Sequence, residues 1–177
     1  MSKTDLLSDE AWTDVSHEAQ SDFLRFGEEM VRSTLSLGHG ADLRATTMMG
    51  IFGTVGVALF AAAATLIAAS QPHWPGIVAA TLGASGLFLA AAFCGAAAWP
   101  RYFFVAGFEP QDLLNSSAKN DRFRVRVLIA VVQDRIDHNR RAIIRAARLA
   151  MIAVWTAGFS VVAAVAVFLL LEAHRLA

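Results

Sequence analysis

The stretch "ATTMMGIFGTVGVALFAAAATLIAASQPHWPGIVAATLGASGLFLAAAFCGAAAWP", residues 45–100, decides the fold of this chain. It lies between Arg44 and Arg101 and contains no Asp, Glu, Lys or Arg. A helix that crosses the hydrocarbon core of a bilayer needs about 20 apolar residues, so this stretch is long enough for two. The segment "SQPHWPG" (70–76) divides it, because its two prolines and its glycine favour a tight turn. The pattern predicts a hairpin of two membrane-spanning helices.

A second run without charge, between Arg148 and Glu172, is long enough for one further span. Of the 177 residues, 56% are hydrophobic and only 17% are charged, which disfavours the alternative of buried helices in a large soluble protein. The sequence therefore predicts an all-α integral membrane protein. Its three transmembrane helices are expected near residues 45–69, 77–99 and 149–171.

The distribution of Lys and Arg predicts the orientation of these spans. Segment 101–148 carries ten of them, the turn at 70–76 carries none, and the tail after the third span carries only Arg175. Segment 101–148 and the N-terminus are therefore expected in the cytoplasm, and the short C-terminus outside a bacterial inner (plasma) membrane. Residues 1–44 are polar and acidic and lack the basic start and apolar core of a secretory signal.

These patterns divide the chain into four parts. They are an acidic amphipathic cytoplasmic arm (1–44), a two-span hairpin (45–100), a basic cytoplasmic helical segment (101–148), and the third transmembrane helix with a short outer tail (149–177). The arm is expected to be helical because apolar residues recur at spacings of three and four, and Ser8 or Asp9 can cap its start. The apolar residues with this spacing are Trp12, Val15, Ala19, Phe23, Phe26 and Met30.

The arm and the basic segment carry equal and opposite charge. Residues 1–44 contain nine acidic and four basic side chains, a net of −5, and residues 101–148 contain ten basic and five acidic ones, a net of +5. Either the two segments dock on each other, or each is solvated by itself and the basic one is held to anionic lipid. The basic side chains that would contact lipid or the acidic arm are Arg140, Arg141, Arg145 and Arg148.

The stretch "VVQDRIDHNRRAIIRAARLAMIAVWTAGFS" (131–160) passes from charged to uncharged sequence without Gly or Pro before Leu149. A cytoplasmic helix, the stalk helix, is therefore expected to continue unbroken into the third span. Its apolar positions follow a heptad spacing, which predicts an oligomer seam. The seam residues are Val125, Ile129, Val132, Ile136, Asn139 and Ile143.

Asn139 is the one strongly polar residue in that seam. A single Asn in an apolar seam can fix the register and the number of helices; the alternative is a tolerated polar residue near a helix surface. The seam could meet the N-terminal helix of its own chain or the same helix of a neighbouring chain, and the sequence leaves both open.

Both spans of the hairpin contain rows of small residues, which allow close contact between helix backbones. The rows predict that these two helices pack closely against other helices, but they do not indicate which helices. The first consists of Gly50, Thr54, Ala58 and Ala62, and the second of Ala79, Gly83, Leu87, Ala91 and Gly95. The single cysteine, Cys94, excludes a disulfide framework and is expected to be buried.

The sequence offers no catalytic constellation. Its five histidines are scattered and do not cluster with one another, and Gly50, Gly53 and Gly56 lie in a span rather than in a phosphate-binding loop. The Arg-rich segment lacks the aromatic residues of a nucleic-acid site and adjoins a span. No Asp, Glu, Lys or Arg lies inside a span, which disfavours a conventional transporter. We expect a non-enzymatic protein without cofactor, metal or nucleic acid.

Two motifs resemble bacterial Pycsar-type transmembrane effectors and the related SLATT-like small membrane proteins. The stretch "GADLRATTMMGIFGTVGVAL" (40–59) is similar to the entry into their first span, which places that motif on Asp42, Arg44 and Ala45. The stretch "QDRIDHNRRAIIRAARLAMI" (133–152) is similar to their cytoplasmic helix, with Ile136 and Asn139 on its Ile-x-x-Asn.

The resemblance implies anti-phage defence, in which a cyclic nucleotide signal causes the effector to assemble and damage the inner membrane. The chain has no separate region of the size of a typical nucleotide-binding domain, so a separately encoded sensor protein is an alternative partner to the nucleotide itself. A second functional hypothesis is a membrane scaffold or accessory subunit whose cytoplasmic helices bind a partner protein.

Overall fold

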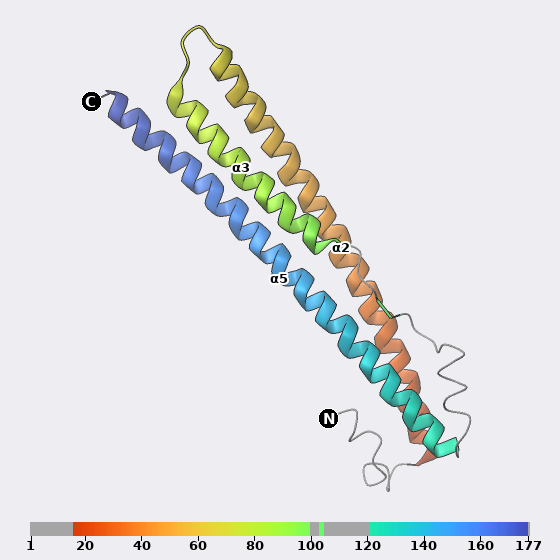
Figure 1. The fold of residues 1–177 in the computed structure, drawn as a ribbon. Helices are drawn as coiled ribbons and strands as arrows, with labels where there is room; N and C mark the ends of the chain where they lie inside the picture. The colour runs from red at the N-terminus through yellow and green to blue at the C-terminus, as the bar shows by residue number, and fades with distance from the viewer. Residues whose placement is uncertain (1–15, 100–102, 105–120, 177) are drawn as a thin grey trace. The chain divides into compact units, whose positions relative to one another are not determined.

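The structure, a computed structural model, describes residues 16–99, 103–104 and 121–176. These residues form three helices, α2 (His17–Ala68), α3 (Trp74–Ala97) and α5 (Asp121–Leu176) (Figure 1). The predicted all-α fold is confirmed for this part of the chain. The predicted cap at Ser8 or Asp9 and the apolar positions Trp12 and Val15 lie outside the described residues.

Helix α2 joins the predicted arm and the first span into one helix of 52 residues. The predicted boundary between the arm and the first span, at residues 44 and 45, lies in the interior of this helix. Its sequence contains no proline, the residue that most strongly interrupts a helix, and each glycine costs only about 1 kcal/mol relative to alanine. An acidic arm can therefore continue into an apolar span without a break.

Of the two prolines predicted to form the turn, Pro72 lies between α2 and α3, whereas Pro75 belongs to α3. Pro75 occupies the first turn of α3, where its missing N–H costs nothing, and His73 is the N-cap. The His73 side chain accepts a hydrogen bond from the backbone N–H of Gly76, at 3.2 Å between Nδ1 and N. At the other end, Ala98 N–H donates to the Cys94 carbonyl at 2.9 Å and closes the last turn.

Helix α5 is continuous over 56 residues and passes through Leu149 without interruption. The prediction that the charged segment and the following apolar run form one unbroken helix is confirmed. The helix contains only one glycine, Gly158, and no proline.

All three helices are long and apolar enough to cross a membrane. In the most apolar 18-residue stretch of each helix, few residues are buried within the chain: 11% in α2, 33% in α3 and 6% in α5. Large side chains such as Phe60, Phe159 and Leu170 are exposed instead. The outward faces of these helices are therefore apolar, as lipid-facing surfaces are.

The chain forms two compact units, and helices α2 and α5 contribute to both. The first comprises Met1–Gly40 and Arg101–Ile144, and the second Ala41–Pro100 and Arg145–Ala177.

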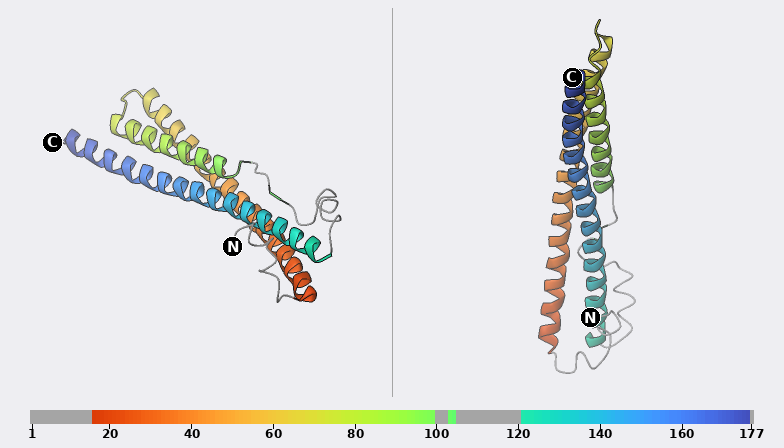
Figure 2. Two further views of the ribbon diagram at one scale, coloured as in Figure 1. Left: turned by 60° about the horizontal axis from the view of Figure 1, so that its bottom comes forward. Right: turned by 90° about the vertical axis from the view of Figure 1, so that its left-hand side faces the viewer.

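In the second unit, α3 lies beside the C-terminal parts of α2 and α5 (Figure 2). Its buried core comes from α3 and α5, with partly buried residues of α2 packed against it. The buried residues are Leu87, Ala90, Cys94, Ala153 and Ala157, and the α2 residues are Met48, Phe52 and Leu59. The predicted burial of Cys94 is confirmed.

The two rows of small residues have different surroundings. In the second row, Gly83 lies against Leu59 and Ala164, and Gly95 lies against Met49. The first row is exposed along its length, from Gly50 to Ala62, and a Cβ added at Gly50 would meet nothing within 4 Å. Only the second row is used for packing within the chain.

Candidate functional site

In the first unit, the N-terminal part of α2 packs on the N-terminal part of α5 through apolar side chains. Val31 of α2 is buried together with Val132 and Ile136 of α5, and Leu24 and Leu35 pack against them. The helices approach each other closely at Gly27, where an added Cβ would lie 2.6 Å from Val132 Cγ1. The described part of the acidic arm therefore packs on α5 through an apolar contact, and a contact of the arm with the predicted arginines stays a prediction.

Asn139 binds the backbone of Phe104 with both ends of its amide. Its Nδ2 donates to the Phe104 carbonyl at 3.1 Å, and its Oδ1 accepts from the Phe104 N–H at 3.0 Å. The Asn139 side chain is 0% exposed. A buried amide satisfied by two backbone groups imitates a pair of strand hydrogen bonds and fixes Phe104 against α5.

Further side chains of the first unit hold Phe104 and its neighbour Phe103. The Phe104 ring makes an edge-on contact with His138, with centroids 5.0 Å apart, and the guanidinium carbon of Arg135 lies 5.9 Å from its centroid. The Phe103 ring lies against Gly38 of α2, where an added Cβ would be 3.1 Å from Cζ. We call Asn139, Phe104 and Phe103 the Phe–Asn clamp. Phe104 is bound to Asn139 of α5 and Phe103 lies against Gly38 of α2, so the two phenylalanines contact both long helices.

The predicted oligomer seam is occupied, in part, by contacts within the chain. Val132 and Ile136 face α2, and Asn139 holds Phe104, while Val125, Ile129 and Ile143 are half-buried. These contacts correspond to the alternative in which the seam meets its own chain. Contact between seams of neighbouring chains stays a prediction.

The four predicted basic contacts, Arg140, Arg141, Arg145 and Arg148, are all exposed. Arg141 Nε donates to the Asp137 carbonyl one turn earlier, at 3.1 Å. Their exposure leaves them accessible to anionic groups, and their contact with lipid stays a prediction.

The family-like entry motif lies within α2. Ala45 is buried, Asp42 is half-buried and Arg44 is exposed. The Asp42 carbonyl accepts a hydrogen bond from Thr46 Oγ1 at 2.8 Å. The motif marks a change of composition along a continuous helix.

The second unit contains a polar pair that the sequence analysis did not identify. His73 Nε2 lies 3.2 Å from Glu172 Oε2 near the end of α5. Nδ1 accepts from the Gly76 N–H, and the contact between Nε2 and Oε2 is not aligned as a hydrogen bond, since Oε2 is buried without a hydrogen-bond partner in the part of the chain that the structure describes. The pair joins the turn between α2 and α3 to α5. No sequence spacing could have revealed it, because the two residues lie far apart in the chain.

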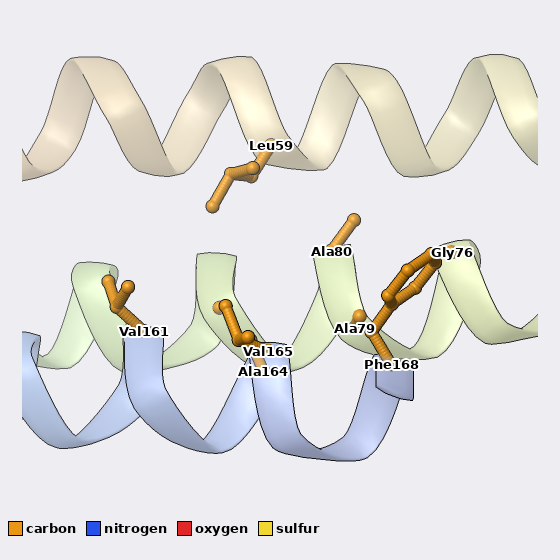
Figure 3. Close-up of a pocket in the computed structure, with 9 residues that line it drawn as sticks. Leu59, Gly76, Ala79, Ala80, Val161, Ala164, Val165 and Phe168 are labelled. Atoms are coloured by element: carbon orange, nitrogen blue, oxygen red, sulfur yellow. The ribbon is translucent and has the colours of Figure 1, made fainter. Parts of the chain in front are cut away.

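An apolar groove of about 300 Å³ lies next to this pair. Figure 3 shows that its lining comes from all three helices of the second unit. Its lining residues are Leu59 of α2; Gly76, Ala79, Ala80 and Gly83 of α3; and Val161, Ala164, Val165 and Phe168 of α5. None of them has a polar side chain, so the groove offers hydrocarbon contact and no group for chemistry.

Among the described residues, no three His, Cys, Asp or Glu side chains come together in a way that could hold a metal ion. Comparison of the chain with known protein families, with curated proteins and with solved structures finds no match. The Phe–Asn clamp of the first unit is therefore the candidate functional site, on the strength of its buried polar contacts alone.

Proposed function

We propose that this chain is an oligomeric effector of the bacterial inner membrane, which perturbs membrane integrity when its cytoplasmic part is triggered. The observation that carries the proposal is the set of three long helices with exposed apolar faces. The resemblance of residues 40–59 and 133–152 to Pycsar-type effectors supports the class of function.

The dimensions and the aromatic residues of α3 support membrane insertion. Its 24 residues correspond to about 36 Å of helix, compared with about 30 Å for the hydrocarbon core. Trp74 and Trp99 are both exposed and lie at its opposite ends, where tryptophans of membrane helices meet the two interfaces. With the basic segment in the cytoplasm, α3 runs inward from the outer surface.

Perturbation of the membrane by this chain requires several copies. The core of the second unit is filled by apolar side chains, and no Asp, Glu, Lys or Arg lies between Arg44 and Arg101. One chain therefore provides no polar path across the bilayer. The exposed row from Gly50 to Ala62 suits close packing with further helices. Thr54 within it already donates to the Gly50 carbonyl, at 2.8 Å.

The first unit is the part on which a trigger would act. The Phe–Asn clamp holds Phe103 and Phe104 against α2 and α5, so a ligand that displaces Phe104 would break this contact between the two helices. A separate sensor protein or a cyclic nucleotide is the proposed trigger. A scaffold or accessory subunit, whose cytoplasmic helices bind a partner protein, is the second candidate.

Strong induced expression in bacteria, followed by entry of a membrane-impermeant DNA dye, tests the proposal. High protein concentration favours assembly by mass action even without the trigger, so we expect dye to enter cells that express the wild type. The control is Phe159→Arg, which places a charge on an exposed position within the third span and costs about 3 kcal/mol in insertion. Wild-type protein that reaches the membrane fraction without admitting dye would contradict the effector function and favour the scaffold.

A further inference from the structure

Five exposed side chains of α5 lie along one face of the helix, within the second unit. They follow one another at intervals of three, four, three and four residues, so they span an arc of only about 80° around the helix. The first two are cationic and the other three are apolar. We call this set the α5 stripe, and it consists of Arg145, Arg148, Ile152, Trp155 and Phe159.

Helix α5 packs on the rest of the second unit through a different face. Ala153 and Ala157 are buried in the core of this unit, about 140° around the helix from the centre of the stripe. The stripe is therefore left open by the residues that the structure describes. Ile152, Trp155 and Phe159 have exposed fractions of 46%, 63% and 68%, and both arginines are exposed.

The cationic end of the stripe has no counter-charge on the adjoining part of its helix. No Asp or Glu lies between Asp137 and Glu172. Among the described residues, neither Arg145 nor Arg148 takes part in an ion pair. The two guanidinium groups lie one turn apart on an exposed face, and a guanidinium binds phosphate oxygens through two parallel hydrogen bonds. The two arginines therefore present a site for a phosphate group.

The apolar end of the stripe continues the cationic end directly. The change occurs between Arg148 and Ile152, one turn apart, where the charge-free run of the third span begins. From Arg145 to Phe159 the helix rises by about 21 Å. One leaflet of a bilayer, with its headgroups, is about 20–22 Å thick. The stripe thus has the length of one phospholipid, and it presents partners for a phosphate and for hydrocarbon in the same order.

We propose that the α5 stripe binds one anionic phospholipid of the cytoplasmic leaflet, with the lipid phosphate on Arg145 and Arg148 and one acyl chain along the apolar residues. The rings of Trp155 and Phe159 form the surface for this chain, with centroids 6.0 Å apart and planes tilted by 32°. The inference rests on the proposed function in one respect, that α5 crosses the membrane with its basic end in the cytoplasm, where anionic lipids are concentrated.

The residues of the stripe disfavour two other occupants. If two chains inserted in the same orientation paired their stripes, Arg145 and Arg148 would face the same arginines of the second copy, and like charges repel. A soluble anion such as inorganic phosphate would contact only the arginines. An anionic phospholipid uses both ends of the stripe, because its charge and its hydrocarbon belong to one molecule.

Quenching of tryptophan fluorescence by brominated lipids tests the proposal. The substitutions Trp12→Phe, Trp74→Phe and Trp99→Phe leave Trp155 as the single tryptophan. The full chain is reconstituted in phosphatidylcholine vesicles with a minor share of phosphatidylglycerol, and either one lipid or the other carries bromine on its acyl chains. Since each arginine near the surface favours anionic lipid about fivefold, we expect phosphatidylglycerol at Trp155 to exceed its share of the lipid by at least about fivefold.

A matched pair of double variants separates the stripe from a general attraction between the protein and anionic lipid. Arg145→Gln together with Arg148→Gln should abolish the enrichment. Arg32→Gln together with Arg44→Gln removes the same number of charges from exposed positions of α2 and should leave the enrichment in place. An equal loss in the two double variants overturns the proposal.

A second reporter position tests whether the lipid lies on the stripe itself. Trp155→Phe combined with Val154→Trp moves the single tryptophan by one residue, about 100° around the helix, to a position that is also exposed. Phosphatidylglycerol at this position should be close to its share of the lipid. Equal enrichment at positions 154 and 155 overturns the site.

The remaining outcomes distinguish the lipid site from the proposed function. Quenching of Trp155 by the two lipids in proportion to their shares overturns the site and leaves the effector function. Loss of the enrichment with inorganic phosphate, but not with sodium chloride of the same ionic strength, assigns the arginines to a soluble anion and also overturns the site. Quenching at position 154 but not at 155 shows that protein covers the stripe, with the same consequence. Quenching at neither position contradicts membrane insertion, and with it both proposals.

Discussion

Replacing Asn139 by leucine removes both hydrogen bonds that hold the backbone of Phe104, while it approximately keeps the side-chain volume. The two bonds are 3.1 and 3.0 Å long, and Phe104 is half-buried. Each bond contributes about 0.5–1.5 kcal/mol net, and a buried backbone group left without a partner costs about 1–3 kcal/mol. Since water can reach part of Phe104, we take about 2 kcal/mol for the loss of both hydrogen bonds. This corresponds to an increase of about thirtyfold in the equilibrium constant for the release of Phe104 from α5.

Hydrogen exchange at the Phe104 amide measures this change directly. The Asn139→Leu variant should exchange this amide about thirty times faster than the wild type. The matched control is Gln133→Leu, which removes an exposed amide from the same helix. Its hydrogen bond reaches only Asp137, at 3.2 Å, so Phe104 should be unaffected. Unchanged exchange in Asn139→Leu, or an equal increase in Gln133→Leu, would refute the assignment of the clamp.

Two further variants test the packing and the polar pair of the second unit. Gly86→Ala should weaken the contact between α3 and α5 by about 1–3 kcal/mol, because the new Cβ would overlap Ser160. Thermal unfolding in detergent measures this change. The control is Gly53→Ala, where nothing lies within 4 Å, so it should gain up to about 1 kcal/mol from the higher helix propensity of alanine. His73→Asn keeps an N-cap acceptor but loses the contact with Glu172, whereas His73→Ala loses both, so the Ala variant should be less stable than the Asn variant by about 1 kcal/mol. Equal stabilities of the two His73 variants would contradict the role of His73 as a cap.

The helices could be predicted from the sequence because their signals are local. Runs without charge mark the apolar spans, and the absence of Gly and Pro before Leu149 predicts the continuity of α5. The continuity of α2 was not anticipated, because the change from acidic to apolar composition at Arg44 suggests a boundary that the backbone does not require. Helical hydrogen bonds are indifferent to whether the side chains face water or lipid.

The candidate site could be predicted only in part. The heptad spacing identified Val132, Ile136 and Asn139 as a seam, but its partner depends on contacts between distant segments. The partner of Asn139 is the backbone of Phe104, and backbone atoms carry no sequence signal. The apolar positions predicted for the arm include Phe26 and Met30, which are exposed, but not Leu24 and Val31, which face α5. The sequence shows both sets as apolar and does not distinguish them.

The central claim, that three helices cross the membrane and place the first unit in the cytoplasm, is tested most directly by cysteine accessibility in intact cells. In a Cys94→Ala background, cysteine replaces one of two exposed glutamines, Gln71 in the turn between α2 and α3 or Gln133 on α5. A membrane-impermeant maleimide should label the Gln71→Cys variant in intact cells, and the Gln133→Cys variant only after the membrane is opened. Labelling of the Gln133→Cys variant in intact cells would contradict the account, as would equal labelling of both variants.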